Sequence, residues 1–319
     1  MTRGELKTRL GRVLGSAVVE ASPLPVGFGL TGLTVQLADG RRLAVKARQD
    51  VEAGTSNLEL EAYMLGELAR HSELPVPQVH YADPSLLVMD FIETDGGEIT
   101  PSVERHAGEL IAKLHATPRE RFGYARDTLI GPLPQPNPET RDWVSLFRDH
   151  RLLFMAKEAH REGSLPAEML RRIERLAERI EDHLEEPAFP SLLHGDLWTG
   201  NVLVREGRVA GLVDPAIYCG HPEVELAFAT LFGTFGKAFF EAYAGSMKLA
   251  PGFSTSFAQA STISIRGSCM SGCSGRAIWR GSTRRWRGSV SSGLGKKEPA
   301  RMDRAGLPCE TSRAPKAWP

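Results

Sequence analysis

His194-Gly195-Asp196-Leu197-Trp198-Thr199-Gly200-Asn201 is the stretch that decides the interpretation of this chain. It follows a short apolar run at residues 191–193, which predicts a strand leading into a loop. Phosphoryl transfer needs a carboxylate that orients the nucleophile or accepts its proton, together with oxygen ligands for magnesium. On a loop, Asp196 and Asn201 can face one cavity, so we predict Asp196 as the catalytic base and Asn201 as a metal ligand.

A second carboxylate follows shortly after this loop. Residues 202–204 and 209–213, joined across Glu206-Gly207, predict an antiparallel strand pair that ends at Asp214. An isolated His-Gly-Asp can be a simple turn, and an isolated Asp-Pro can simply end a strand. Together, however, the two features reproduce the order of the catalytic and metal-binding loops of kinases. We therefore predict Asp214 as the second magnesium ligand.

The N-terminal part supplies a candidate cation for the nucleotide phosphates. Residues 33–37 and 42–46 flank Asp39-Gly40, which predicts a β-hairpin. Lys46 ends the run Leu43-Ala44-Val45-Lys46, which is similar to the V-A-I-K strand whose lysine contacts phosphates. On this pattern alone, a surface lysine is an equally good interpretation.

A predicted helix over residues 55–71 offers that lysine a carboxylate partner. Glu61 can pair with Lys46, and Glu59 is the alternative, about 200° away around the helix axis. Because Ala62 and Leu65 are expected to face the core, Glu61 is the better candidate.

Further residues are candidates for binding ATP, the predicted cofactor together with Mg²⁺. Gly27 and Gly29 lie in a glycine-rich segment and permit a close approach of the backbone to phosphates, although such a loop is weak evidence alone. Residues 87–91 predict the strand that enters the connection between two lobes. We expect Met89 to line the adenine pocket and the backbone from Asp90 to Ile92 to bond the adenine edge; a plain buried strand is the alternative.

The order of elements predicts an α+β, bilobal, protein-kinase-like fold. Residues 1–92 would form a small N-lobe of mixed β-sheet and helix, with further strands at 79–82 and 86–92. Residues 93–253 would form a mainly helical C-lobe, helical from 100 to 186 apart from a proline-rich loop at 131–138. Within it we expect helices at 103–115 and 139–163 and another beginning after Pro166.

Composition limits the class of protein. The chain has 319 residues, of which 41% are hydrophobic and 24% charged, as in ordinary globular proteins. No stretch approaches the roughly 20 apolar residues that cross a bilayer, and residues 1–11 lack the apolar core of a signal peptide. The four cysteines show no disulfide-scaffold pattern. We expect a cytoplasmic protein without a membrane partner.

Residues 254–319 differ from the rest of the chain. They hold twelve Lys or Arg but three Asp or Glu, and no Tyr or His. A basic binding arm, a disordered tail and a changed reading frame near residue 253 are the three explanations. We favour the changed frame, because shifted GC-rich codons yield Trp, Cys, Arg, Ser and Gly, and we expect no nucleic-acid partner. Cys269 and Cys273 lack the further ligands that zinc requires.

The motif residues resemble the fructosamine kinase (ketosamine-3-kinase) family, a relative of the aminoglycoside and choline phosphotransferases. The likeness runs over residues 10–253 and is most specific in residues 194–201, in Asp214-Pro215-Ala216 and in residues 218–227. Trp198 within the loop and the later G-H-x-E-x-E-L-A pattern separate this family from other phosphotransferases. Cys219 is a departure, since an aromatic residue is common there.

The resemblance implies transfer of the ATP γ-phosphate to the 3-hydroxyl of a ketoamine sugar, of the fructosamine or ribulosamine type, on a small or protein-linked amine. The 3-phosphate would then eliminate and free the amine, which amounts to deglycation. It implies the following roles: Asp196 as base, Asn201 and Asp214 as Mg²⁺ ligands, Lys46 and Glu61 as the phosphate-anchoring pair, Trp198 as a sugar-stacking platform or a core residue, His221 as a substrate contact or, preferably, a helix cap, and Glu225 as a support for the catalytic-loop backbone.

Two alternatives stay open. One is a kinase for another small amine-containing alcohol, such as an aminoglycoside or a choline-like amine. The other is a catalytically impaired nucleotide-binding protein, because the helices that the family has after residue 253 are missing. Their loss would leave Phe232, Phe235, Phe239 and Phe240 partly exposed.

Overall fold

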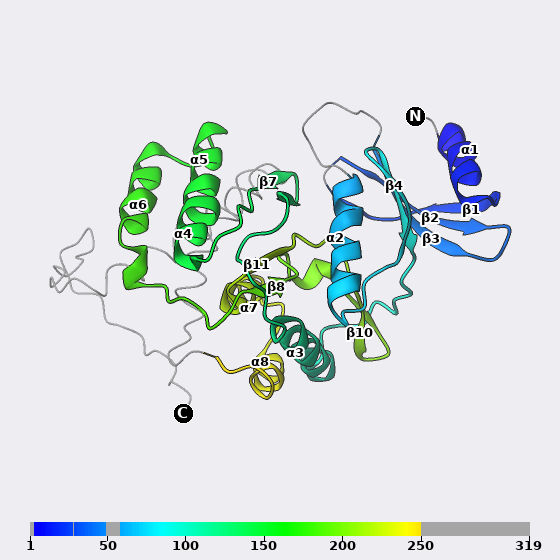
Figure 1. The fold of residues 1–319 in the computed structure, drawn as a ribbon. Helices are drawn as coiled ribbons and strands as arrows, with labels where there is room; N and C mark the ends of the chain where they lie inside the picture. Colours follow the sequence, from blue (N-terminus) through cyan, green and yellow to red (C-terminus); the bar gives the residue numbers. More distant parts are fainter. Residues whose placement is uncertain (1–2, 28, 49–57, 250–319) are drawn as a thin grey trace, which may run out of the picture. The chain divides into compact units, whose positions relative to one another are not determined.

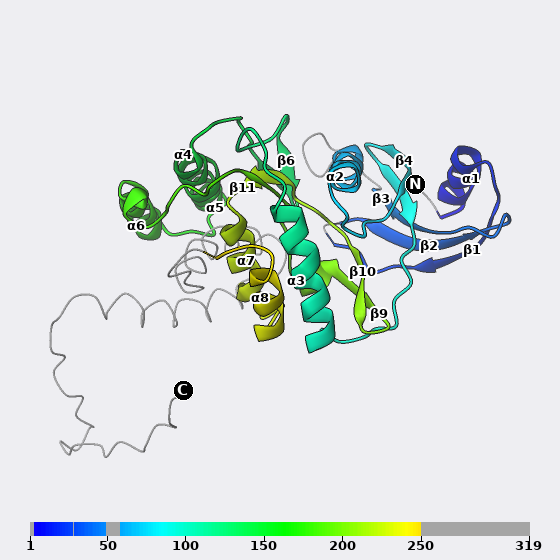
Figure 2. The same cartoon turned by 60° about the horizontal axis from the view of Figure 1, so that its bottom comes forward.

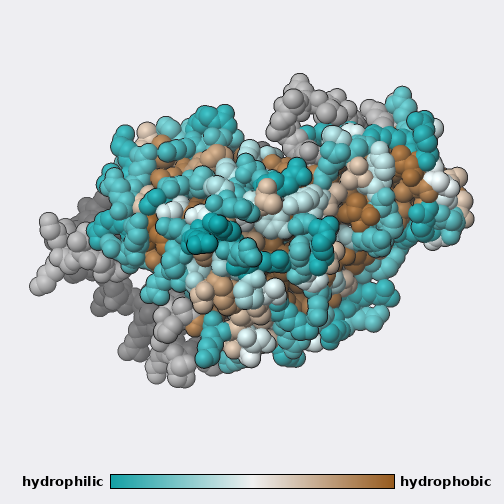
Figure 3. Space-filling view, viewed as in Figure 1, coloured by the Kyte–Doolittle hydropathy of each residue, from teal (hydrophilic) through white to brown (hydrophobic). Residues whose placement is uncertain are grey.

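The computed structural model describes residues 3–27, 29–48 and 58–249 (Figure 1). The predictions for residues 254–319, including Cys269 and Cys273, lie outside the described residues, as do residues 55–57 of the predicted helix. Within the described part of the chain, no helix is both long and apolar enough to cross a membrane. The face shown in Figure 3 is mostly hydrophilic, with hydrophobic residues visible in small groups.

The N-lobe is built on an antiparallel five-stranded sheet of order β1-β2-β3-β5-β4. Its strands are β1 (Val18–Pro23), β2 (Thr31–Leu37), β3 (Arg42–Ala47), β4 (Val79–Asp83) and β5 (Leu86–Asp90), and its helices are α1 (Arg3–Leu14) and α2 (Leu58–His71). The predicted hairpin and strand pair are confirmed. The sequence analysis missed α1 and β1, because β1 is an edge strand with a largely exposed side and shows no apolar alternation.

The alternation of side chains along β3 decides where Lys46 lies. Leu43 and Val45 pack with α1 on one face of the sheet. Ala44 and the neighbouring Met89 pack on the opposite face, with residues of α2. Because side chains alternate between faces in a strand, Lys46 belongs to the α2 face, where it stands opposite Leu87 in the ladder.

The C-lobe is mainly helical. Its helices are α3 (Pro101–His115), α4 (Trp143–Phe147), the π-helix η1 (Arg148–Leu153), α5 (Phe154–Arg161), α6 (Ala167–Ala177), the 3₁₀ turn η2 (Ile180–Asp182), α7 (Pro222–Leu231) and α8 (Lys237–Ala244). Helix α3 begins with the two signals that helices favour, since the Thr100 side chain accepts a hydrogen bond from Val103 N and proline follows directly. In Figure 2, α3 and α8 lie side by side.

The prediction of helix over 100–186, apart from a loop at 131–138, is wrong for the residues between α3 and α4 that lie outside that loop. This segment contains a hairpin of β6 (Thr128–Ile130) and β7 (Leu133–Gln135). The predicted helix at 139–163 begins only at Trp143 and passes through η1. Prolines interrupt the helix pattern here, and buried polar side chains of the hairpin bond backbone groups elsewhere: Gln135 Nε2 donates to Ala216 O at 2.9 Å, and Thr128 Oγ1 donates to Ile217 O at 3.0 Å.

Two small strand pairs frame the motif loops. β9 (Val202–Arg205) pairs with β10 (Arg208–Leu212), as predicted, directly after the 3₁₀ turn η3 (Thr199–Asn201). β8 (Ser191–Leu193) pairs with β11 (Tyr218–Gly220), a strand that the sequence analysis missed. The segments from 194 to 201 and from 213 to 217 are therefore each held at both ends by strands.

The predicted partial exposure of Phe232, Phe235, Phe239 and Phe240 is wrong for two of these four residues. Phe235 and Phe239 are buried, and their rings stack with centroids 4.3 Å apart. Phe239 lies where α8 meets α3: a Cβ on Gly108 would stand 2.4 Å from Phe239 O, so the two helix backbones approach closely at that glycine. This packing against α3 keeps the apolar face of α8 covered, while Phe232 and Phe240 are half-buried.

Candidate active site

An ion-pair group forms around the Lys46 ammonium. Nζ lies 2.7 Å from Glu61 Oε1 and also forms an ion pair with Asp214 Oδ1. The lysine side chain is 7% exposed, so β3 brings its charge into the interior of the lobe junction. Glu61 therefore occupies the predicted partner position, whereas Glu59 is exposed. The structure brings together three of the predicted site residues at one point.

Burial and charge oppose one another in this group. Burial alone would lower the pKa of Lys46, but the negative charges and hydrogen bonds of Glu61 and Asp214 outweigh it and raise that pKa above its ordinary value. Burial raises the pKa of Glu61 to about 7 in spite of the attraction of Lys46, and the charge of Asp214 acts in the same direction as burial. Two carboxylates thus compete for one ammonium.

The amide of Asn201 orients the carboxylate of Asp196. Asn201 Nδ2 donates at 2.8 Å to Asp196 Oδ2 and at 2.8 Å to Asp196 O. Asn201 is buried in η3, and its backbone carbonyl accepts from Val213 N at 3.1 Å. Since the amide nitrogen is engaged with Asp196, the carbonyl oxygen is the atom of this side chain that would meet a cation.

Asp214 lies beside Asn201 through its backbone. Asn201 Nδ2 is 3.4 Å from Asp214 O, whereas the Asp214 carboxylate pairs with Lys46. The predicted proximity of the two metal-ligand candidates is therefore present, with the carboxylate turned to the N-lobe lysine. Asp214 has a φ of 53°, in the left-handed region that aspartate tolerates better than most residues.

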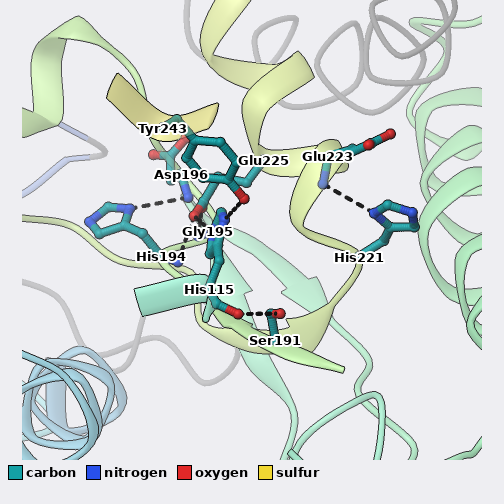
Figure 4. A network of polar contacts seen from close by, with 9 residues as sticks. All are labelled: His115, Ser191, His194, Gly195, Asp196, His221, Glu223, Glu225 and Tyr243. Atoms are coloured by element: carbon teal, nitrogen blue, oxygen red, sulfur yellow. Dashed lines mark hydrogen bonds and ion pairs between the residues drawn. The ribbon is translucent and has the colours of Figure 1, made fainter. Parts of the chain in front are cut away.

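The loop before Asp196 is held by hydrogen bonds to the Glu225 side chain (Figure 4). Glu225 Oε1 accepts from Gly195 N at 2.5 Å, and Oε2 accepts from His194 N at 3.2 Å. Burial works to raise the pKa of Glu225, but the hydrogen bond and charge of His115 and the bond from Gly195 lower it overall. The side chain is therefore an anionic acceptor for two loop amides, which is the backbone support expected from its sequence position.

Only glycine fits at position 195. Its φ is 83°, and a Cβ at this position would lie 1.9 Å from Ala216 O. His194 is fully buried beside it, with Nδ1 accepting from Asp196 N at 3.3 Å, and burial lowers the pKa of this histidine. The loop that carries Asp196 and the segment after Asp214 are thus in backbone contact.

His221 and Trp198 each have a clear structural environment. His221 caps α7, because its Nδ1 accepts from Glu223 N at 3.1 Å, and burial lowers its pKa to about 4, with His115 acting in the same direction. The half-buried Trp198 ring lies 5.8 Å from that of Phe232. It also covers Gly200, where a Cβ would be 2.5 Å from the indole. Their substrate contacts stay predictions.

The candidate nucleotide residues lie on or next to inner strands of the N-lobe sheet, with Met89 and Asp90 on β5 and Gly27 and Gly29 before β2. Met89 is buried on the α2 face, as an adenine-pocket residue would be. Asp90 N donates to Gln78 O at 2.9 Å, so this N–H serves the sheet, and the Ile92 side chain packs against Gly211. Around Gly27 and Gly29 a Cβ would meet no atom within 4 Å, and Gly29 has a φ of 70°.

Two buried residues next to this site were not predicted from the sequence. His115 and Tyr243 are 0% and 1% exposed, and His115 Nε2 lies 2.9 Å from Glu225 Oε2. A histidine at the end of an amphipathic helix and a tyrosine in an aromatic-rich helix carry no distinctive spacing. Nothing in the sequence therefore links either of them to the catalytic loop.

Comparison with known proteins identifies relatives of most of the described region. The sequence model of the fructosamine kinase family matches residues 10–258. A "Probable ketoamine kinase" of Synechocystis sp. is 35% identical over 202 residues, which cover 61% of this chain and 65% of the relative. The chloroplastic protein-ribulosamine 3-kinase of Arabidopsis thaliana is 28% identical over 229 residues, 68% of each chain. The match thus spans less than two thirds of the cyanobacterial relative.

Solved structures share the fold. A Thermobifida fusca protein assigned as a fructosamine-3-kinase superposes with a TM-score of 0.79 at 27% identity, covering 91% of this chain and 100% of its own. The ADP-bound aminoglycoside phosphotransferase APH(2'')-Ib superposes with a TM-score of 0.53 at 17% identity, covering 84% of this chain and 86% of its own. The predicted α+β kinase-like fold is therefore confirmed.

Proposed function

This chain belongs to the fructosamine kinase family, and from that membership we propose that it transfers the γ-phosphoryl group of ATP to the 3-hydroxyl of a ketoamine sugar carried on an amine. The names of its relatives support this acceptor, since they include a ketoamine kinase and a protein-ribulosamine 3-kinase. The ketoamine 3-phosphate would then lose phosphate by elimination and release the amine, which makes the pathway a deglycation. The cytoplasm is the compartment that we propose.

Lys46 is the proposed anchor of the nucleotide phosphates. Glu61 holds Nζ at 2.7 Å from the α2 side, so the ammonium is already directed before nucleotide binds. Phosphate oxygens would replace the Asp214 carboxylate as the second anionic partner of Nζ. This exchange would relieve the competition of two carboxylates for one ammonium.

The remaining nucleotide contacts follow from the N-lobe sheet. Gly27 and Gly29 leave open space beside the backbone, which permits phosphates to approach it closely. We propose that Met89 packs on the adenine. Because the Asp90 N–H is used within the sheet, the adenine edge would be bonded by the carbonyl of Asp90 or by the backbone of Ile92.

Asn201 and Asp214 are the residues that would hold magnesium. An amide oxygen and a carboxylate fit this ion, which binds oxygen ligands and completes its shell with water and substrate phosphates. Within the described part of the chain, no group of three or more His, Cys, Asp or Glu could hold a metal, so two protein ligands plus phosphate is the arrangement that fits. The ion would supply positive charge to the reacting phosphates.

Asp196 is the proposed base. As the sugar 3-oxygen bonds to the γ-phosphorus, the bond from that phosphorus to the β–γ bridging oxygen breaks, and ADP leaves with the electron pair. The hydroxyl proton passes to the Asp196 carboxylate, which Asn201 holds at 2.8 Å. Trp198 would stack against the apolar face of the sugar. The capping bond of His221 supports a structural role for that residue.

The observation that carries the proposal is the joint placement of Lys46, Glu61 and Asp214 with the Asp196–Asn201 pair. The test incubates the full chain with Mg-ATP and either a fructosyl-amine, an aminoglycoside or choline, and follows the phosphorus NMR spectrum. We expect a sugar 3-phosphate from the fructosyl-amine, followed by free phosphate. Asp196→Ala should abolish transfer and keep ATP affinity. Transfer only to the aminoglycoside or choline, or to no acceptor despite ATP binding, would refute the proposal.

A further inference from the structure

A continuous chain of buried hydrogen bonds links helix α8 to the catalytic loop (Figure 4). Tyr243 OH lies 2.9 Å from His115 Nδ1, and His115 Nε2 lies 2.9 Å from Glu225 Oε2. Glu225 in turn accepts from the amides of His194 and Gly195. We propose that Tyr243 and His115 are positioning residues for phosphoryl transfer, acting through Glu225 to hold the loop that carries Asp196.

The direction of the hydrogen bonds to Glu225 follows from the chemistry of the partners. A carboxylate only accepts, so His115 Nε2 carries a proton and donates to Glu225. The other ring nitrogen, Nδ1, lies 2.9 Å from the Tyr243 hydroxyl, a group that both donates and accepts, so the tyrosine completes the pairing of the imidazole. Burial raises the pKa of Tyr243, and the charge of Glu225 acts in the same direction, so the hydroxyl keeps its proton. Both ring nitrogens of His115 and both carboxylate oxygens of Glu225 are therefore engaged in hydrogen bonds.

Burial makes this chain of bonds rigid. The side chains of His115 and Glu225 are 0% and 1% exposed, so water is not available to replace a lost partner. The position of His115 is fixed from a second side, because Ser191 Oγ donates to His115 O at 2.7 Å. Tyr243 is fixed by the close approach of α8 to α3 at Gly108.

These hydrogen bonds affect the proposed reaction by fixing the backbone that positions Asp196. The two amides that Glu225 holds belong to the residues directly before Asp196, and Gly195 stands in a conformation, φ 83°, that other residues rarely adopt. A shift of Glu225 would move these amides and, with them, the Asp196 carboxylate. Because catalysis depends on reacting groups held to within fractions of an ångström, such a shift should lower the rate rather than the affinity for substrate.

The test uses Tyr243→Phe in the full chain, with Tyr81→Phe as the matched control. Tyr81 also donates one hydroxyl hydrogen bond, to Asp83 Oδ2 at 2.8 Å, but it lies on β4, away from the catalytic loop. For Tyr243→Phe we expect kcat to fall about 3- to 10-fold at an unchanged KM for ATP, which corresponds to one hydrogen bond. The amide proton resonances of His194 and Gly195 should shift as well. Tyr81→Phe should leave kcat and the amide resonances of His194 and Gly195 unchanged.

A double-mutant cycle separates positioning from general stability. Glu225→Gln should lower kcat by about tenfold or more, since it removes a charged acceptor. Adding Tyr243→Phe to Glu225→Gln should then have no further effect on kcat. Multiplicative effects on kcat, or unmoved amide resonances in Tyr243→Phe, would overturn the proposal. The kinetic part of this inference rests on the proposed function, whereas the resonance measurement needs no substrate. Failure of the proposed function can therefore be distinguished from failure of the positioning role of Tyr243 and His115.

Discussion

Replacing Gly195 by alanine tests the contact between the catalytic loop and the segment after Asp214. The added Cβ would lie 1.9 Å from Ala216 O and 2.5 Å from Ala216 C, and both atoms are backbone. Restoring a contact of 3.4 Å requires the two segments to separate by about 1.5 Å, the difference between these distances. A left-handed conformation costs alanine about 1–2 kcal/mol, and relieving the overlap adds about 1–3 kcal/mol. We expect Gly195→Ala to lower the free energy of unfolding by about 2–5 kcal/mol.

Gly207→Ala supplies the matched control. Gly207 has a φ of 68° at the turn between β9 and β10, but a Cβ there would meet no atom within 4 Å. It should therefore show the conformational cost alone, about 1–2 kcal/mol, and leave kcat unchanged. For Gly195→Ala, a displacement of this size next to Asp196 should lower kcat by about 100-fold.

The assays are urea unfolding for stability and ADP release with a ketoamine acceptor for rate. The difference in the free energy of unfolding between Gly195→Ala and Gly207→Ala gives the cost of the steric overlap alone. If Gly195→Ala is destabilised no more than Gly207→Ala and turns over at the wild-type rate, the inference of a rigid contact between the two loops is refuted.

Three further predictions concern the ion-pair group, the cap of α7 and the indole. Lys46→Met should weaken ATP binding more than tenfold in a titration with a fluorescent analogue, and should destabilise the chain by about 2–4 kcal/mol, because it leaves Glu61 without its cation; unchanged affinity would contradict the anchoring role. His221 has a folded pKa of about 4, below its unfolded value, so the unfolded state binds more protons between these values and stability should fall by about 1–2 kcal/mol from pH 7 to pH 5. His221→Asn keeps a capping group and should remove that part of the pH dependence in urea titrations; an unchanged dependence would refute the assignment. Trp198→Ala should raise the KM for the ketoamine about tenfold at constant KM for ATP; a loss of stability with both constants unchanged would make it a core residue.

Local patterns predicted the parts of the site that lie on regular elements. The alternation that ends at Lys46 and the helical spacing around Glu61 each place a side chain on one face, and the packing of α2 on the sheet brings the two faces together. The loop residues Asp196 and Asn201 were predictable because five-residue spacing on a loop leaves few ways to separate them. The roles of all these residues stay predictions until activity is measured.

The rest depends on tertiary contacts that no local pattern encodes. Thr128 lies in a segment that was predicted helical and Gln135 in the predicted loop, yet both are buried in a hairpin whose side chains bond the carbonyls of Ile217 and Ala216, far along the chain. Phe239 was expected to be exposed because the missing helices seemed its only cover. The close packing that Gly108 permits supplies that cover instead. The division of the chain at residues 92 and 253 also stays a prediction.

The ion-pair group around Lys46 also has a consequence for how the chain folds. Its partners stand 15 and 168 residues away along the sequence, so no short segment can assemble the group alone. Closing the longer of these loops is slow and unfavourable in entropy until both lobes have formed. Nucleotide that binds only the assembled group would stabilise both lobes together by mass action. During synthesis, ATP binding would therefore mark chains that have completed folding, and heating with ATP should merge the unfolding of the two lobes into one transition.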